Sequence, residues 1–143
     1  MASGIYPSFL EEVFKGNVNP HTGTFRVMIV GPGYTPLPLS HTRRSDITSE
    51  ISATGYVAGG EVVDISVLRV DWTLTISVPA TQWAAIASGA TGRRGIVYHS
   101  RGGLATVDEL AVCIDPNENK PTNGTAYVVS LQQQPRIVVA TWS

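Results

Sequence analysis

The sequence has little charge of either sign. Charged side chains make up 15% of its 143 residues and the formal net charge is -1, whereas about 25% charged residues is usual in soluble domains. A near-neutral chain offers no basic face for nucleic acid and no polybasic segment for an anionic membrane, so we expect neither partner. A chain this poor in charge must cover apolar surface in its core or in an assembly, and we favour association.

The sequence also has one cysteine only, no metal ligands at a suitable spacing and no long apolar run. The single cysteine, Cys113, excludes an internal disulfide, and its apolar neighbours predict a buried side chain rather than a nucleophile. The histidines His21, His41 and His99 stand far apart in the sequence, so we expect no metal site. No apolar run approaches the about 18 residues of a membrane span, and the first residues lack the pattern of a signal peptide.

Two loops resemble ligand-binding motifs but fail at the decisive positions. Residues 115–119 look like the first half of a calcium loop, yet Lys120 stands where the glycine belongs. Residues 89–95 look like a phosphate loop without its Gly-Lys-Ser/Thr ending, so we interpret them as a flexible turn that carries two arginines. We expect no catalytic residue, no cofactor and no metal, and therefore a protein that is not an enzyme.

Turn residues between short β-rich runs dominate what remains. The chain has 14 glycines and 9 prolines, which is typical of an all-β domain with many turns. One helix is predicted over residues 8–15, with Ser8 and Glu11 as a capping box and Gly16 as its stop. A loop with one helical turn is predicted over 81–89. Strands are predicted over 24–30, 55–60, 68–78, 95–99, 109–115, 125–131 and 136–142.

The clearest periodic signal lies between residues 68 and 78. Apolar side chains alternate there with polar ones, and the apolar set is Leu68, Val70, Trp72, Leu74, Ile76 and Val78. Such alternation predicts one strand with a buried face and a solvated face, which places Trp72 in the core. The order of elements predicts a single mainly β domain over residues 1–143, an antiparallel β-sandwich or barrel-like fold with an N-terminal arm and helix over 1–16.

A long segment without a periodic pattern covers residues 31–52. It begins with several prolines and glycines and continues with the polar cluster from His41 to Asp46, near which a short helical turn is expected. Loops of this length in compact domains are usually functional. We therefore predict a contact loop over 31–52.

The order of several short motifs resembles a family of small structural proteins of tailed bacteriophage particles. The motifs cover nearly the whole chain and are Gly4-Ile5-Tyr6-Pro7-Ser8-Phe9, Gly16-Asn17-Val18, Phe25–Val30 followed by Tyr34-Thr35-Pro36, Ile47–Ile51, Thr54-Gly55-Tyr56 with Ala58-Gly59-Gly60, Trp83, Gly95–Tyr98, Ile114-Asp115 and Asn123-Gly124. The resemblance implies a virion protein that is assembled in the host cytoplasm. Its most plausible role is that of a capsid decoration (cement) protein, a trimer by preference, with the major capsid protein or other virion proteins as partners.

Two other functions remain open at this point. A tail, head-tail connector or fibre-base subunit would share the same resemblance. A carbohydrate-binding β-sandwich module could use tryptophan rings as stacking platforms, for which Trp83 and Trp142 are open candidates.

The contact residues are expected in loops and in the N-terminal arm. Arginine and tyrosine are enriched at protein interfaces, and several of them stand in the segments that we predict to be irregular. The candidates are Ile5, Tyr6, Tyr34, Arg43, Arg44, Arg93 and Arg94.

Overall fold

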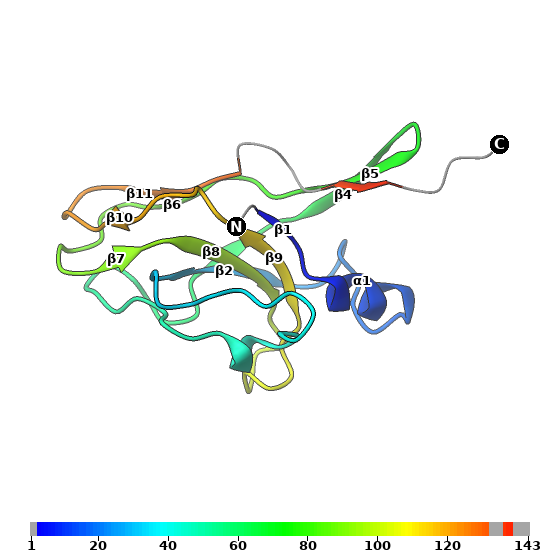
Figure 1. Cartoon of the computed structure of the whole chain (residues 1–143), viewed down its shortest axis with the longest axis horizontal. Coiled ribbons are helices and arrows are strands. Elements are labelled where there is room, and N and C mark those ends of the chain that lie inside the picture. Colours follow the sequence, from blue (N-terminus) through cyan, green and yellow to red (C-terminus); the bar gives the residue numbers. More distant parts are fainter. Residues whose placement is uncertain (1–2, 132–135, 139–143) are drawn as a thin grey trace.

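The computed structural model describes residues 3–131 and 136–138 (Figure 1). Its central element is a five-stranded antiparallel sheet in the order β1-β9-β8-β2-β3. Its strands are β1 (Gly4–Ile5), β2 (Phe25–Val30), β3 (Glu61–Val63), β8 (Arg94–His99) and β9 (Leu110–Ile114). The three middle strands are covered on both faces, which explains why they are nearly continuous apolar runs in the sequence.

Three small antiparallel sheets lie along one face of this central sheet (Figure 1). They are formed by β4 (Ser66–Val70), β5 (Thr73–Ser77) and β12 (Arg136–Val138), by β6 (Thr81–Trp83) and β11 (Tyr127–Val129), and by β7 (Thr91–Gly92) and β10 (Lys120–Pro121). The prediction of a mainly β fold with one short helix is confirmed. The finer prediction of a sandwich or barrel stays a prediction, because the second layer is divided among separate small sheets.

Side chains of the central sheet point alternately into two hydrophobic clusters, one on each face of the sheet. Phe25, Val27 and Ile29 of β2 point into the larger cluster, which also contains residues of the small sheets, such as Ile76 and Trp83. Met28 and Val30 point the other way. Tyr6, Tyr34, Ile96, Tyr98, Leu110 and Cys113 complete this second, smaller cluster. The burial of Cys113 confirms the prediction of a structural cysteine, and burial raises the pKa of its thiol to about 12.

The helix α1 (Pro7–Phe14) begins one residue earlier than predicted and lacks the predicted cap. Pro7 occupies the first turn, where its missing N–H costs nothing, and the hydroxyl of Ser8 is buried without a hydrogen-bond partner. Gly16 ends the helix at φ 81, as predicted. The ring of Phe9 packs edge to face against Phe25 with a centroid distance of 6.0 Å, so the helix docks on the larger cluster.

The prediction of one strand over residues 68–78 is wrong, because the chain turns back at Asp71-Trp72. Val70 pairs with Thr73, and the two halves of the run form the hairpin β4–β5. Asp71 takes the left-handed conformation at φ 51, which aspartate tolerates better than most residues. Trp72 lies in the turn and is 48% exposed, so its predicted place in the core is also wrong.

Two further segments differ from the prediction. Residues 55–60 form turns rather than a strand, with Gly55, Gly59 and Gly60 at positive φ. Gly60 lies against β2, and a Cβ atom on it would stand 1.8 Å from the carbonyl oxygen of Val27. Within 81–89, residues 81–83 form β6, which pairs with β11. The predicted strand over 136–142 is described only as β12, and Trp142 lies outside the described residues.

Candidate interaction surface

The predicted contact loop 31–52 is fixed to the connection between β8 and β9. Backbone N–H groups of Arg44, Ser45 and Leu110 donate to the carbonyl oxygens of Asp108, Ala105 and Thr42 at 2.9, 3.2 and 3.1 Å. The guanidinium Nε of Arg44 donates to the buried carboxylate of Asp108 at 2.8 Å. Residues 31–52 and 100–109 therefore form one ordered layer, which we call the loop face. The short helix η1 (Arg44–Asp46) lies in it and confirms the predicted helical turn.

The inner side of the loop face packs on the central sheet through tyrosines. The hydroxyl groups of Tyr6 and Tyr34 lie 2.9 Å apart, and the hydroxyl of Tyr34 lies 2.9 Å from Nδ1 of His41. Burial raises the pKa of Tyr34, so its phenol stays neutral. Tyr6 and Tyr34 are each only 1% exposed, so these two predicted contact side chains hold the loop on the core instead of facing a partner. Ile5 lies on β1 and packs partly buried against the larger cluster.

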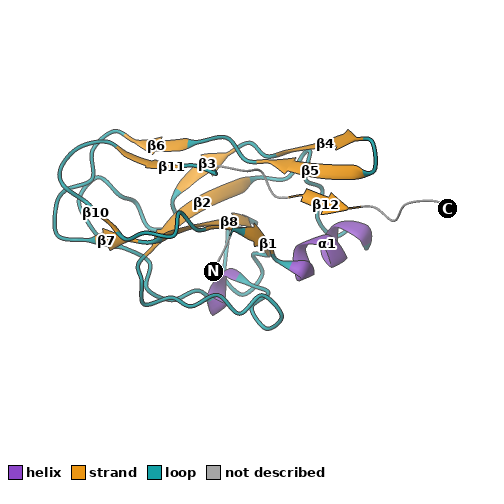
Figure 2. Ribbon diagram, turned by 45° about the horizontal axis from the view of Figure 1, so that its top comes forward, coloured by secondary structure: helices purple, strands orange, loops and turns teal. Residues whose placement is uncertain are grey.

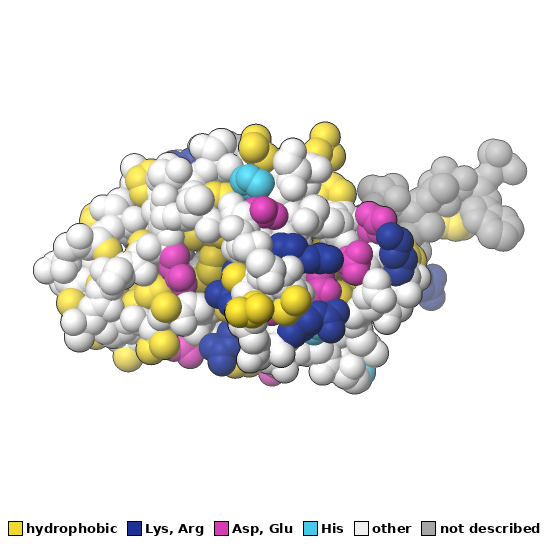
Figure 3. All heavy atoms as spheres, turned by 90° about the horizontal axis from the view of Figure 1, so that it is seen from below, with side chains coloured by type: hydrophobic (Ala, Val, Ile, Leu, Met, Phe, Trp, Pro, Cys, Tyr) yellow, Lys and Arg dark blue, Asp and Glu magenta, His cyan; other side chains and the backbone are white. Residues whose placement is uncertain are grey.

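The outer side of the loop face carries large apolar side chains in solvent. Leu39 is 90% exposed and Leu104 is 74% exposed, and Leu37 and Val107 are exposed beside them in the same two segments. Figure 3, which views the molecule from below, shows apolar side chains gathered beside Lys and Arg side chains. The sequence carries a signal for the exposure of two of them. Leu37 and Leu39 alternate with prolines, and such a loop cannot bury them by strand or helix periodicity.

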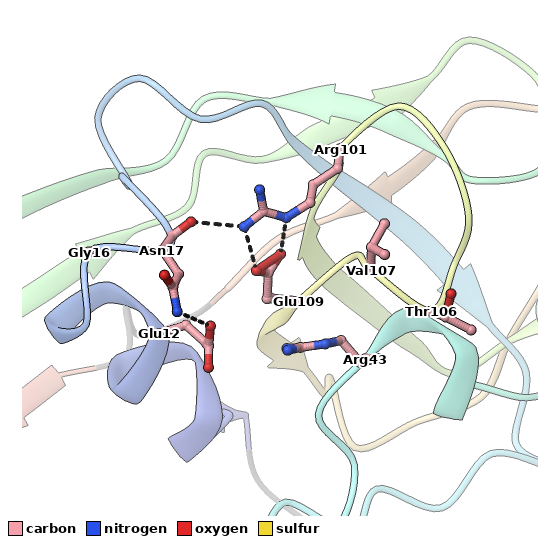
Figure 4. A pocket seen from close by; sticks show the side chains of 8 residues that line it. All are labelled: Glu12, Gly16, Asn17, Arg43, Arg101, Thr106, Val107 and Glu109. Carbon is pink, nitrogen blue, oxygen red and sulfur yellow. Dashed lines mark hydrogen bonds and ion pairs between the residues drawn. The ribbon is translucent and has the colours of Figure 1, made fainter.

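A shallow pocket opens between the loop face and the end of α1 (Figure 4). Its volume is ≈ 570 Å³, and it is lined by Glu12, Gly16, Asn17, Arg43, Arg101, Thr106, Val107 and Glu109. Arg101 is held by both oxygens of Glu109, at 3.0 and 2.8 Å. Arg43 forms no ion pair with a carboxylate among the residues that the structure describes. Of the two predicted contact arginines of this loop, Arg44 is thus occupied by Asp108, whereas Arg43 is half-buried and lines the pocket.

Glu109 is the centre of a buried ionic cluster under the pocket. Besides Arg101 it accepts a hydrogen bond from Nδ1 of His99 at 3.0 Å. Burial alone would raise the pKa of Glu109, but the hydrogen bonds from Arg101 and His99 outweigh it and lower this pKa to about 2. The carboxylate is therefore charged across the physiological range, and it ties the β8–β9 connection to residue 17, whose carbonyl oxygen accepts from Arg101 at 2.8 Å.

Acid should weaken the protein through Glu109. Because the pKa of Glu109 falls on folding, its contribution to stability is complete above its ordinary pKa of 4.5 and is lost as the pH falls through about 2. We expect Glu109→Gln to be less stable than the unchanged protein at pH 7, with a difference that shrinks steadily below pH 4.5. Urea unfolding at a series of pH values measures this difference, and a constant gap between the two proteins down to the lowest pH would contradict it.

The other predicted arginine pair does not form a flexible turn. Arg94 begins β8 and Arg93 lies just before it, and their Nε atoms donate to the two carboxylate oxygens of Asp115 at 3.1 and 3.2 Å. Arg93 also donates to the side chain of Asn117 at 3.2 Å, and Arg94 donates to the carbonyl oxygen of Tyr34 at 2.7 Å. Both side chains are largely covered. The pair joins β8 to the end of β9 and to the contact loop, and its role in an interface stays a prediction.

The described residues contain neither a cluster of metal ligands nor a membrane-spanning helix. No group of three or more His, Cys, Asp or Glu side chains within residues 3–131 and 136–138 could hold a metal ion. None of the helices in this part of the chain is long and apolar enough to cross a membrane.

Comparison with known proteins gives no assignment. No protein-family model, no curated protein and no solved structure matches the chain. Any function must therefore be argued from the surface itself.

Proposed function

We propose that this protein is a structural subunit of a bacteriophage particle, a capsid decoration (cement) protein that binds the head shell through its loop face. The observation that carries the proposal is the pairing of exposed leucines with rigid loops. Leu39 and Leu104 stand in solvent on segments that Arg44 and Asp108 hold together. An apolar surface that is ordered before binding loses little conformational entropy when a partner covers it.

The chemistry of the loop face suits a protein partner. Apolar anchors with arginines beside them are the composition of protein interfaces, and Arg43, which lines the pocket at this surface, provides a cation. The role needs no catalytic group, no cofactor and no contact with nucleic acid or membrane. The proposed partner is the major capsid protein, and a homo-oligomer, by preference a trimer, suits the local symmetry of a shell. The resemblance of the motif order to small virion proteins supports the same reading.

The carbohydrate-binding alternative loses support from the tryptophans. Trp83 is buried and packs against Tyr56 and Tyr127, so it cannot serve as a stacking platform. Trp72 is exposed, but it lies at the tip of a hairpin rather than on a flat strand face.

The test is incorporation into particles. Phage that lacks the gene is grown with the protein supplied in trans, and the copies per purified particle are counted. We expect copies comparable to the number of shell subunits, and heads that leak when the protein is absent. The double variant Leu39→Asp with Leu104→Asp should lose most of its incorporation, because two charges would have to be buried at the contact.

A matched control uses another exposed apolar residue. Val57 is exposed but lies outside the loop face, so Val57→Asp should be incorporated like the unchanged protein. A copy number far below that of the shell subunits, with intact heads lacking tails after deletion, would replace decoration by a connector or tail role. Absence from the particle would refute the virion role altogether, and full incorporation of the double variant would refute the loop face as the contact.

A further inference from the structure

The segment from Leu37 to His41 is a turn that His41 closes twice. The backbone N–H of His41 donates to the carbonyl oxygen of Leu37 at 2.8 Å, and the backbone N–H of Leu37 donates to the ring atom Nδ1 of His41 at 3.3 Å. Leu37 and Leu39, two of the exposed apolar side chains of the loop face, stand on this turn. Figure 1 draws it in cyan below the central sheet, and Figure 2 shows the same layer of loops from a second angle.

The hydrogen bond from Leu37 fixes the protonation state of the His41 ring. A backbone N–H can only donate, so Nδ1 of His41 accepts and carries no proton. The hydroxyl of Tyr34, which lies 2.9 Å from the same nitrogen, then donates to it as well. The oxygen of Tyr34 in turn accepts from the hydroxyl of Tyr6 at 2.9 Å. These contacts require a neutral His41 with its proton on Nε2.

A proton on Nδ1 would disrupt this arrangement at two places. The N–H of Leu37 would face another N–H, and the turn would lose one of its closing hydrogen bonds. The new N–H would donate to Tyr34, which would have to direct its own hydrogen toward Tyr6. Both tyrosines are buried, and a buried hydroxyl that loses its acceptor costs free energy. Protonation of His41 therefore opposes the closed turn.

A carboxylate stands near the ring on the next element of the chain. Asp46 belongs to η1, and its Oδ2 accepts from the backbone N–H groups of Arg43 and Thr42 at 3.0 and 2.9 Å. These hydrogen bonds lower the pKa of Asp46, and the nearby His41 and the charge of Arg43 add to the effect. Asp46 is therefore charged near neutral pH and can attract a protonated His41.

The groups that contact the ring from the side of the sheet are uncharged. Burial raises the pKa of Tyr34, of Tyr6 and of the Cys113 thiol behind them, so all three keep their protons near neutral pH. The cation on this side is Arg94, which is paired with Asp115 and donates to the carbonyl oxygen of Tyr34 at 2.7 Å. This side thus supports a neutral imidazole and offers a charged one little compensation.

We propose that His41 is a pH-sensitive latch of the loop face. As a neutral imidazole it closes the turn 37–41 and holds the side chains of Leu37 and Leu39 in their ordered arrangement. With a proton on Nδ1 the ring leaves Leu37 for the carboxylate of Asp46, and the turn opens. Histidine side chains ordinarily change their charge between about pH 5 and pH 8, which is the interval to examine. The effect of the latch on docking rests on the function proposed above, whereas the latch itself does not.

Nuclear magnetic resonance of the isolated protein tests the latch. At about pH 8 the shifts of the ring nitrogens of His41 should place its proton on Nε2. On titration toward about pH 5 the amide resonance of Leu37 should move together with those of the His41 ring. The amide of Gly124, which donates to the carbonyl oxygen of Ile86 at 2.8 Å, should not follow them. A proton on Nδ1 near neutral pH, or a Leu37 amide that ignores the His41 titration, would refute the latch.

Two substitutions separate the acceptor from the proton. His41→Asn sets a carbonyl oxygen near the place of Nδ1 and cannot gain a proton in this interval, so the Leu37 amide should stay in its closed position. His41→Phe keeps a ring without an acceptor, so this amide should be in its open position at every pH. His21→Asn changes an exposed histidine of another turn and should respond to pH like the unchanged protein. A pH response in His41→Asn equal to that of the unchanged protein would overturn the proposal.

Binding to the shell gives the second readout. Purified heads that lack the protein are mixed with it at about pH 8 and at about pH 5. We expect the unchanged protein to bind about tenfold more weakly at the lower pH, and His41→Asn to bind equally at both. Equal binding of the unchanged protein at both pH values would refute control of docking by His41. No binding at either pH, with the resonances of Leu37 and His41 moving as expected, would refute the proposed function and support the latch.

Discussion

Replacing Gly60 with alanine is expected to remove most of the stability of the protein, about 4 kcal/mol. The new Cβ would stand 1.8 Å from the carbonyl oxygen and 2.6 Å from the carbonyl carbon of Val27. Both are backbone atoms of β2, which pairs on each side with β3 and β8 and cannot yield without breaking those ladders. Gly60 also has φ 79, a conformation that costs alanine further energy.

A second glycine separates the two causes. Gly16 has nearly the same backbone angle, φ 81, but a Cβ atom on it would meet nothing within 4 Å. Gly16→Ala should therefore lose only the backbone term, about 1 kcal/mol. Urea unfolding followed by tryptophan fluorescence measures both variants. Equal losses for the two would show that the clash with Val27 is relieved, contrary to our expectation.

Asp115→Asn is expected to cost about 3 kcal/mol, because it removes the shared partner of two covered arginines. The fully buried carboxylate of Asp115 accepts hydrogen bonds from Arg93, from Arg94 and from the backbone N–H of Asn117 at 2.8 Å. An amide offers only one oxygen, and its NH2 group would face a guanidinium. The variant would leave at least one largely buried guanidinium with only a neutral acceptor, the side chain of Asn117 for Arg93 or the carbonyl oxygen of Tyr34 for Arg94, and a buried charge without its counter-charge is costly.

The control is an ion pair of the same chemistry in solvent. Glu11 and Lys15 lie 2.6 Å apart on α1, with side chains that are 61% and 56% exposed. Glu11→Gln should leave the unfolding midpoint unchanged within error, because water replaces the lost partner. If Asp115→Asn unfolds at the same denaturant concentration as Glu11→Gln, the buried cluster is not a stabilising element.

The sequence predicted best the strands that are buried on both faces. The runs that form β2, β8 and β9 are apolar on both faces, so composition alone marks them as inner strands. The helix and its glycine stop were also visible, although the start was misjudged because Pro7 replaces a side-chain cap. The irregular segment 31–52 was predicted from its lack of periodicity, and its helical turn from the polar cluster around Asp46, whereas its role in contacts stays a prediction.

The hairpin β4–β5 was missed for a reason that lies in the periodicity itself. A turn of two residues leaves the alternation of apolar and polar residues unbroken along the chain, while it exchanges the faces on which they stand. No glycine or proline marks Asp71-Trp72, and the turn depends on the tolerance of one aspartate for positive φ. The same uninterrupted pattern that predicted a core strand produced an exposed arm.

The roles of the arginines could not be read from local sequence. Arg44 finds its partner Asp108 at a distance of 64 residues along the chain, and Arg93 finds Asp115 at a distance of 22. Both arginines stand in polar, turn-like segments that would suit a solvated side chain equally well. Only the fold shows that Arg44, Arg93 and Arg94 connect loops and strands internally, whereas Arg43 lines the pocket beside α1.

The position of the N-terminal strand also sets when this protein can complete its central sheet during synthesis. β1 pairs with Val112 and Cys113 of β9, and Ser3 bonds to Asp115 across 112 residues of sequence. The edge strand β1 therefore leaves the ribosome long before β9, the strand with which it pairs, has been synthesised. Tyr6 packs beneath the contact loop and its backbone N–H donates to Ala111 of β9. It therefore also reaches its final position only after β9 has been made. A chain still in translation therefore cannot complete the support beneath its loop face until β9 has been made.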